Sequence, residues 1–148
     1  MMVSRPILLV EDNPDDEELT RKALKEGNIA NEVVVARDGV EALDYLFGTG
    51  AYAGRDLSRQ PQLILLDLKL PKLSGLEVLE RLRADPRSRL IPVVILTSSS
   101  EEEGVLACYQ KGANSYVRKP IEFHLFIDAV RQVGMYWLLV NQPPPIKP

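Results

Sequence analysis

Cysteine and histidine are nearly absent from the chain, which has one of each, Cys108 and His124, in 148 residues. A single cysteine cannot form an internal disulfide, so the sequence does not fit the disulfide-rich secreted domains. A single histidine excludes most metal sites built from several imidazole ligands. The first apolar run, Ile7–Val10, is too short for the core of a signal peptide, and no run of about 18 apolar residues could span a membrane. We therefore expect a cytoplasmic protein without membrane contact.

An excess of positive charge is also absent. Lysine and arginine total 18 against 21 aspartates and glutamates, so the net charge is −3. No basic field attracts a phosphate backbone, and nucleic acid is not an expected partner. The composition, 45% hydrophobic and 26% charged, is that of an ordinary globular domain. We expect one domain over residues 1–140, followed by a proline-rich tail, NQPPPIKP, at residues 141–148.

Short apolar runs alternate with amphipathic segments along the chain, which is the pattern of βα units around a parallel sheet. The runs are apolar at consecutive positions, so helices must cover both faces of the sheet. Right-handed crossovers then favour an α/β, flavodoxin-like (βα)5 fold, a doubly wound parallel sheet with strand order 2-1-3-4-5. The predicted strands are Ile7–Val10, Val33–Ala36, Leu63–Leu66, Val93–Leu96 and Ser115–Val117.

Residues that favour helix starts follow these runs. A serine, aspartate or asparagine can accept hydrogen bonds from the free amides of a first helical turn. Asp15 and Asp16, just after the first such residue, are expected to interact favourably with the helix dipole. The predicted helix starts are, in chain order, Asn13, Asp38, Ser74 and Ser100.

Acidic side chains follow the first and third predicted strands. Glu11 and Asp12 come directly after Ile7–Val10, and Asp67 comes directly after Leu63–Leu66. In the order 2-1-3-4-5 these strands are neighbours whose following loops diverge, which forms the ligand crevice of such sheets. Three converging carboxylates repel one another unless a cation compensates them. A sparse set of oxygen ligands suits Mg²⁺, so we predict a magnesium site here.

Two further polar groups end the fourth and fifth predicted strands, the hydroxyl of Thr97 and the ammonium of Lys119. Taken singly, Thr97 fits an ordinary strand residue, Lys119 an ordinary surface lysine, and Asp67 a turn former. Taken together they match one reaction, in which a carboxylate attacks phosphorus while metal and cations neutralise the transferring group. Asp67 is then the nucleophile.

The segments ILLVEDN, LILLDLKLPKLSG, IPVVILTSS and SYVRKP together resemble the receiver domain of two-component response regulators, and several motifs in order are far more specific than one. The resemblance implies that Asp67 is the phosphoacceptor. It also implies metal binding by Glu11, Asp12 and Asp67, with a further ligand from the backbone carbonyl of Lys69.

The same resemblance implies catalytic roles for Thr97 and Lys119. It further implies a cis peptide bond between Lys119 and Pro120, and a switch in which Tyr116 turns when Thr97 moves toward the phosphoryl group. The expected partners are a sensor histidine kinase, which supplies the phosphoryl group, and a downstream protein target or phosphotransfer protein.

Two segments resemble a narrower group, the stand-alone regulators that partner phytochrome-type kinases, some of which are dimers. They are the long connection Gly48–Gln62, expected to form a surface loop, and the segment MYWLLV near the C-terminus. Trp137–Val140 either completes the last helix against the core or forms an exposed patch for a partner such as a second copy. We favour the patch, because the core-facing stripe looks complete by Val133.

Two other functions compete with this interpretation. A haloacid-dehalogenase-like phosphatase also uses a nucleophilic aspartate, but it needs a second acid two residues later, where this chain has Lys69. An adaptor with a receiver fold would need no phosphorylation, and the intact Asp67, Thr97 and Lys119 count against it. We therefore expect a phosphorylation switch that catalyses only its own phosphotransfer and dephosphorylation and is otherwise not an enzyme.

Overall fold

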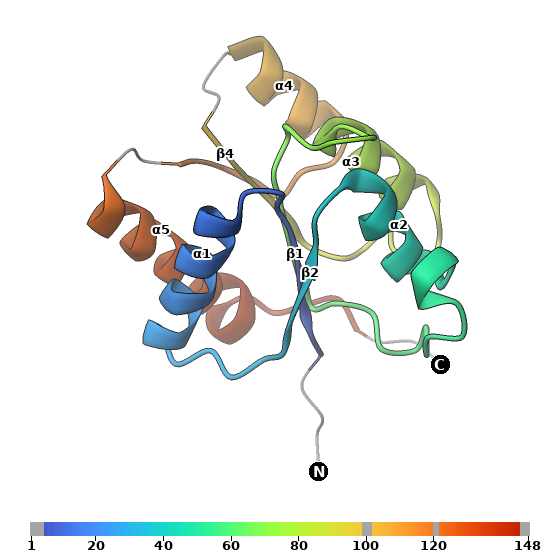
Figure 1. Ribbon diagram of the computed structural model, residues 1–148, viewed down its shortest axis with the longest axis horizontal. Helices are drawn as coiled ribbons and strands as arrows, with labels where there is room; N and C mark the ends of the chain where they lie inside the picture. Colours follow the sequence, from blue (N-terminus) through green and yellow to red (C-terminus); the bar gives the residue numbers. More distant parts are fainter. Residues whose placement is uncertain (1–4, 99–101, 120–121, 146–148) are drawn as a thin grey trace.

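The computed structural model describes residues 5–98, 102–119 and 122–145. Five parallel strands form one sheet in the order β2-β1-β3-β4-β5 (Figure 1), which confirms the predicted flavodoxin-like topology. The first three strands occupy the predicted residues, and the last two each extend one residue further. The strands are β1 (Ile7–Val10), β2 (Val33–Ala36), β3 (Leu63–Leu66), β4 (Val93–Thr97) and β5 (Ser115–Arg118).

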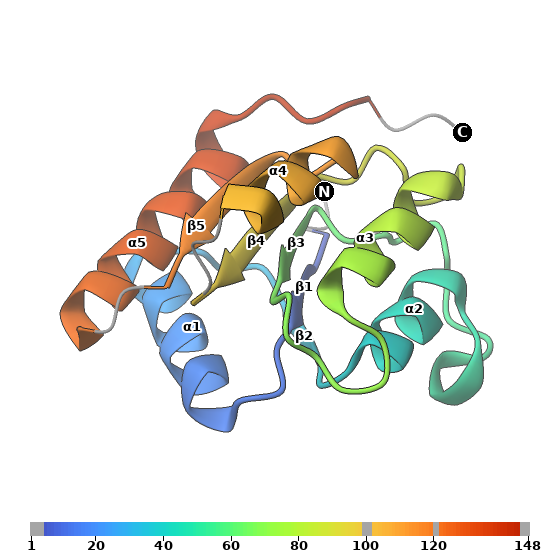
Figure 2. The ribbon, with the colours of Figure 1, turned by 90° about the horizontal axis from the view of Figure 1, so that it is seen from above.

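Helices connect the strands and cover both faces of the sheet. Figure 1 shows α1 and α5 on one side and α2, α3 and α4 on the other, and Figure 2 shows the sheet between these layers from above. The helices are α1 (Pro14–Glu26), α2 (Gly39–Phe47), α3 (Gly75–Ala84), α4 (Glu102–Gln110) and α5 (Phe123–Met135), with a 3-10 turn η1 (Gly50–Tyr52) and a π-helical turn η2 (Tyr136–Val140).

Alternate residues of each strand supply two separate cores. In β1, Leu8 and Val10 pack in the cluster beneath α2 and α3, whereas Ile7 and Leu9 pack in the cluster beneath α1 and α5. All four side chains are buried, because successive residues of a strand point to opposite faces. Because helices cover both faces of the sheet, a central strand such as β1 is apolar at every position.

Three of the predicted helix starts have the expected caps. The side chain of Asn13 accepts hydrogen bonds from the amides of Asp15 and Asp16, and Asp38 and Ser74 each accept one from the glutamate amide three residues later. These bonds satisfy amides that have no partner within the helix. The predicted start at Ser100 lies outside the described residues.

The connection Gly48–Gln62 lies mostly on the surface, as expected, but two side chains fasten it to the end of α2. The buried amide of Gln60 donates to the carbonyl of Leu46 at 2.7 Å. The guanidinium of Arg55 donates to the carbonyl of Tyr45 at 2.6 Å and to the Gln60 side chain at 2.7 Å. These bonds anchor the segment, which includes the short turn η1, to the end of α2.

The C-terminal end of the last helix corrects the sequence interpretation. Trp137 and Leu138 pack against the core, whereas Leu139 and Val140 are 63% and 70% exposed. The apolar stripe does not end at Val133, because Trp137 and Leu138 lie seven and eight residues after Val130 and so continue it. Only part of the predicted patch is exposed.

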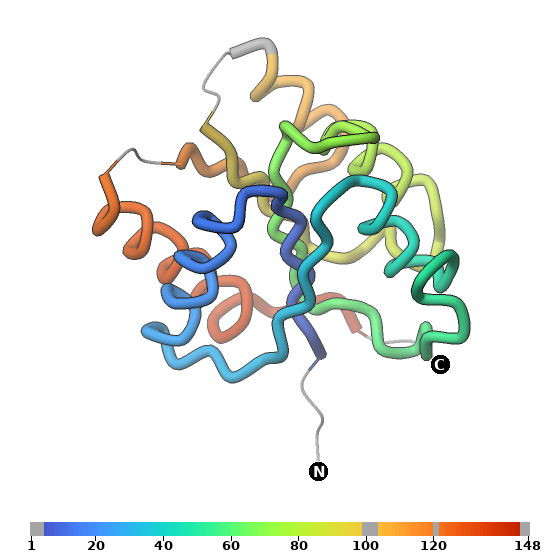
Figure 3. The backbone as a smooth tube through the Cα atoms, in the orientation of Figure 1, coloured from blue at the N-terminus to red at the C-terminus, as the bar shows by residue number. Residues whose placement is uncertain are grey.

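Residues 141–145 follow η2 without helix or strand. Figure 3 shows them leaving the helix at the level where β1 begins, far from the carboxyl ends of the strands. Within the described ranges, no helix combines the length and the apolar character that crossing a membrane requires.

Candidate metal and phosphoryl site

Strand register brings the first acidic residues together. Val10 of β1 pairs with Leu66 of β3, so Glu11 and Asp67, the next residues, leave the sheet side by side. The amide of Asp67 donates to the carbonyl of Val10 at 3.1 Å, and the amide of Glu11 donates to the carbonyl of Ala36 at 2.9 Å. Both backbones are thus still held by the sheet where their side chains begin.

Glu11, Asp12 and Asp67 form a compact group of carboxylates. One oxygen from each lies within 4.8 Å of the others, with Glu11 and Asp67 buried and Asp12 exposed. Among the described residues this is the acidic group with metal-binding spacing. The predicted fourth ligand, the Lys69 carbonyl, stays a prediction; the Lys69 amide lies against the group and donates to Asp67 Oδ1 at 3.3 Å.

Lys119, the residue directly after β5, faces this group. Its Nζ lies 2.6 Å from Glu11 Oε1, 3.2 Å from Asp67 Oδ2 and 2.9 Å from Asp16 Oδ2. Its side chain is only 9% exposed. Burial opposes its charge, but the hydrogen bonds to Glu11 and Asp16 and the charge of Asp67 outweigh burial and raise the pKa of Lys119 above its ordinary value. The lysine is therefore a permanent cation in the site.

Glu11 is the acid most affected by burial. Loss of water around its carboxylate raises its pKa from 4.5 to about 7, although the hydrogen bond and charge of Lys119 act in the opposite direction. The nearby charge of Asp67 adds to the increase. A further cation beside Glu11 would offset this penalty on its charged form, and a divalent ion is suited to that role.

Asp16 is a residue of this site that the sequence interpretation missed. It was expected only to interact with the dipole of α1, but its carboxylate forms an ion pair with Lys119 across the crevice. The position of Asp16 in the first turn of α1, which directly follows the loop with Glu11 and Asp12, is the signal that could have indicated it.

Thr97 provides an unusual buried hydroxyl at the end of β4. The residue is fully buried, and in the part of the chain that the structure describes its Oγ1 is the buried side-chain polar atom without a hydrogen-bond partner. A buried donor without a partner is destabilising. Because the Lys119 amide donates to the Thr97 carbonyl at 2.6 Å, this hydroxyl belongs to the same edge as the carboxylates.

Tyr116, the predicted switch residue, lies in β5 opposite Ile95 of β4. Its ring is half-buried and packs against the apolar cluster beneath α2 and α3. Its movement with Thr97 stays a prediction. Pro120, and with it the predicted cis bond, lies outside the described residues.

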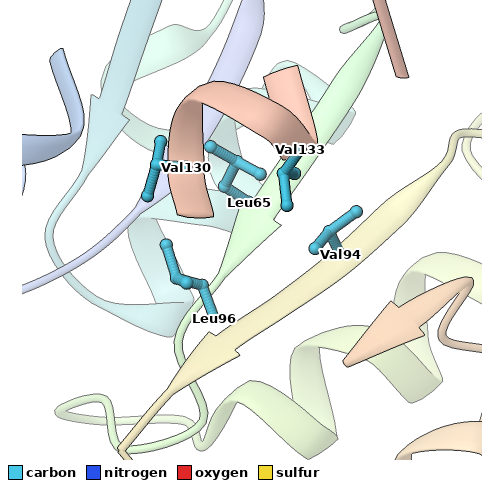
Figure 4. A pocket seen from close by; sticks show the side chains of 5 residues that line it. All are labelled: Leu65, Val94, Leu96, Val130 and Val133. Carbon is cyan, nitrogen blue, oxygen red and sulfur yellow. The ribbon is translucent and has the colours of Figure 1, made fainter. Parts of the chain in front are cut away.

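A pocket beneath α5 is apolar, unlike the charged site formed by Glu11, Asp67 and Lys119. It is lined only by aliphatic side chains that project from β3, β4 and α5 toward one another (Figure 4), and it offers no group for a charged ligand. The lining residues are Leu65, Val94, Leu96, Val130 and Val133.

The donors at the carboxyl edge fit a hard divalent cation. Their ligand atoms are carboxylate oxygens, which Mg²⁺ prefers, and they are too few to form a calcium cage. The ammonium of Lys119 stands beside them, and the partnerless hydroxyl of Thr97 ends β4, the strand next to β3. Both are donors suited to phosphoryl oxygens.

Comparison with known proteins agrees with this chemistry. Residues 7–131 match the response regulator receiver domain family. The response regulator Rcp1 of Synechocystis sp. is 39% identical over 132 residues, which cover 89% of this chain and 88% of Rcp1. The crystal structure of Rcp1 with bound Mn²⁺ superposes with a TM-score of 0.88 at 37% identity, covering 95% of this chain and 99% of that one.

Two further solved structures are similar. The phosphorylated cyanobacterial phytochrome response regulator RcpA has a TM-score of 0.89 and 38% identity, over 97% of this chain and all of that one. The bacteriophytochrome response regulator AtBRR is 53% identical with a TM-score of 0.75, over 95% of this chain and all of that one.

Proposed function

Since the chain belongs to the response regulator receiver domain family, we propose that Asp67 is the phosphoacceptor of a phosphorylation-dependent switch. Phosphorylation on an aspartate, with Mg²⁺, is typical of this family. The observation that carries the proposal is the Lys119 ammonium beside the Asp67 carboxylate, together with the partnerless Thr97 hydroxyl at the end of β4, the strand next to β3.

In the proposed reaction a carboxylate oxygen of Asp67 forms a bond to phosphorus. The bond from phosphorus to the donor nitrogen of a kinase histidine breaks, and its electron pair leaves with the imidazole. Lys119 pairs with one phosphoryl oxygen and the Thr97 hydroxyl donates to another, which offsets the charge of the transferring group. Hydrolysis of the acyl phosphate later restores the carboxylate.

Glu11, Asp12 and Asp67 would hold the divalent ion, with the Lys69 carbonyl as a further ligand. When bound, magnesium neutralises charge on the phosphoryl oxygens. The donor chemistry supports Mg²⁺, and the Mn²⁺-bound form of the similar Rcp1 supports binding of a divalent ion. Tyr116 is the proposed switch residue that senses the movement of Thr97.

Members of this family are generally not classical enzymes, and we assign the chain only its own phosphotransfer and dephosphorylation. We assign the chain itself to the cytoplasm. The phosphodonor proposed here is a sensor histidine kinase of the phytochrome type, because RcpA and AtBRR are named as phytochrome response regulators. Output then passes to a protein target or phosphotransfer protein. We place the domain boundary after Val140, with the exposed end of η2 as a homodimer contact.

The decisive experiment is phosphorylation of the purified protein by acetyl phosphate with Mg²⁺, followed by intact-mass analysis. The wild type should gain one phosphoryl group, which hydroxylamine removes because it cleaves acyl phosphates. Asp67→Asn should gain none. Asp128→Asn, which removes an equally negative but distant side chain on α5, should behave as wild type. A phosphorylated Asp67→Asn protein would overturn the assignment.

A further inference from the structure

The ammonium of Lys119 has three hydrogen-bond partners, and only one of them lies outside the proposed metal and phosphoryl machinery. Glu11 and Asp67 belong to the carboxylate group with metal-binding spacing, whereas Asp16 does not. An ammonium has three donors, so all of them are used by these three carboxylates.

Asp16 is held rigidly for this contact. Its amide donates to the Asn13 side chain at 3.2 Å, and its carbonyl accepts a hydrogen bond from the hydroxyl of the fully buried Thr20 at 2.7 Å. α1 in turn packs against α5. The carboxylate of Asp16 therefore projects from a fixed backbone, and little conformational freedom is lost when it binds the lysine.

Lys119 itself is fixed at its other end. Its amide donates to the carbonyl of Thr97 at 2.6 Å. Between that bond and the ammonium runs a flexible four-carbon chain, which can adopt many rotamers. The position of the ammonium group therefore depends on the residue to which it is hydrogen-bonded.

We infer that Asp16 is a positioning residue for phosphorylation, which holds the Lys119 ammonium beside Asp67 when Glu11 and Asp67 engage the metal and the phosphoryl group. The inference rests on the proposed function of the site. Without Asp16, the partners that the ammonium keeps among the described residues are the two carboxylates that the reaction itself uses. Lys119 would then stay against Glu11, its nearest partner at 2.6 Å, and compete there with the cation.

Asp15 provides a matched control. Asp15→Asn removes the same charge from the same helical turn, and the Asp15 amide, like that of Asp16, donates to Asn13. No described ion pair joins Asp15 to Lys119. A difference between Asp16→Asn and Asp15→Asn therefore reports the contact with the lysine and not the loss of charge.

The first measurement is the rate of phosphorylation by acetyl phosphate at saturating Mg²⁺. We expect Asp16→Asn to slow it about tenfold, the size of effect that misplacement of one charged group produces, and Asp15→Asn to change it less than about twofold. Asp16→Glu keeps the carboxylate and should recover most of the rate.

The second measurement needs neither metal nor phosphate. In ¹⁵N–¹H correlation spectra of lysine ammonium groups, the Lys119 signal is assigned by its loss in Lys119→Arg. It should be protected from exchange in wild type and in Asp15→Asn, and should shift and exchange faster in Asp16→Asn.

The inference is overturned if Asp16→Asn matches Asp15→Asn in both rate and ammonium spectrum. Failure of the proposed function would look different, because the wild type itself would then take no phosphoryl group from acetyl phosphate. Circular dichroism of each variant confirms that folded proteins are compared.

Discussion

Lys119 and Thr97 are joined through their main chains, because the amide of Lys119 donates to the carbonyl of Thr97 at 2.6 Å. The cation and the buried hydroxyl proposed to bind phosphoryl oxygens therefore keep a fixed separation at their backbones. The sheet edge, and not a mobile loop, sets this geometry. The two side chains can be tested by separate substitutions, because the Lys119 ammonium is ion-paired whereas the Thr97 hydroxyl has no partner.

Replacing Thr97 by valine should stabilise the unphosphorylated protein while slowing phosphorylation. The substitution removes a buried hydroxyl that has no partner and keeps the side-chain shape, so we expect a gain of about 1 kcal/mol in the free energy of unfolding. Urea denaturation measures it. Thr20→Val is the control. It removes a hydroxyl that donates to the backbone carbonyl of Asp16, so it should lower the free energy of unfolding. A less stable Thr97→Val protein would contradict the interpretation.

Replacing Lys119 by methionine should destabilise the metal-free protein. The change leaves Glu11 and Asp67 buried without their cation, and loss of one partner of a buried ion pair costs about 3 kcal/mol. Thermal and urea unfolding in the presence of a chelator give the value. Lys111→Met, which breaks an exposed pair with Glu80, should cost less than about 1 kcal/mol. Equal losses in the two variants would argue against the buried network.

Adding Mg²⁺ should raise the melting temperature of the wild type, because a ligand that binds only the folded state stabilises it, by about 2.7 kcal/mol at a hundred times its dissociation constant. Asp12→Asn should lose most of this shift, since Asp12 belongs to the carboxylate group. Asp128→Asn on α5 should retain it. A shift that survives in Asp12→Asn would place the ion elsewhere.

The stability of the metal-free protein should fall as pH rises from about 4.5 to about 7. Burial raises the pKa of Glu11 to about 7 in the folded chain from 4.5, so within this window the folded state binds more protons than the unfolded state. Stability from this group is therefore greatest below the window. Glu11→Gln has no proton to lose there, and its pH dependence should be flatter. If the stability of both proteins changes equally with pH, Glu11 is not the cause of the pH dependence.

Replacing Leu139 by aspartate should shift any homodimer toward monomer, because the side chain is 63% exposed at the end of η2 and a charge there would be buried in the contact. Light scattering coupled to size exclusion measures the molar mass. Leu125→Asp is matched in exposure, at 59%, but lies at the other end of α5. If the dimer persists in Leu139→Asp but dissociates in Leu125→Asp, the contact lies near the start of α5 and not at η2.

The cap of α5 shows how a local contact can be missed from sequence. Glu122 accepts hydrogen bonds from the amides of His124 and Leu125 at 3.1 and 3.0 Å. Glutamate is not among the favoured capping residues, so residue preference gave no reason to expect it. By contrast, Asn13, Asp38 and Ser74 were predictable because their side chains are short and act within one turn.

The sequence by itself determined the five strands, their order and the edge at which Glu11, Asp67, Thr97 and Lys119 meet. This was possible because runs apolar on both faces must pair in a covered parallel sheet, and parallel strands end at one edge. Only the tertiary structure decided that Lys119 binds Asp16, 103 residues away in the chain. Such contacts depend on how helices pack on the sheet, and packing between distant segments leaves no periodic signal in the sequence.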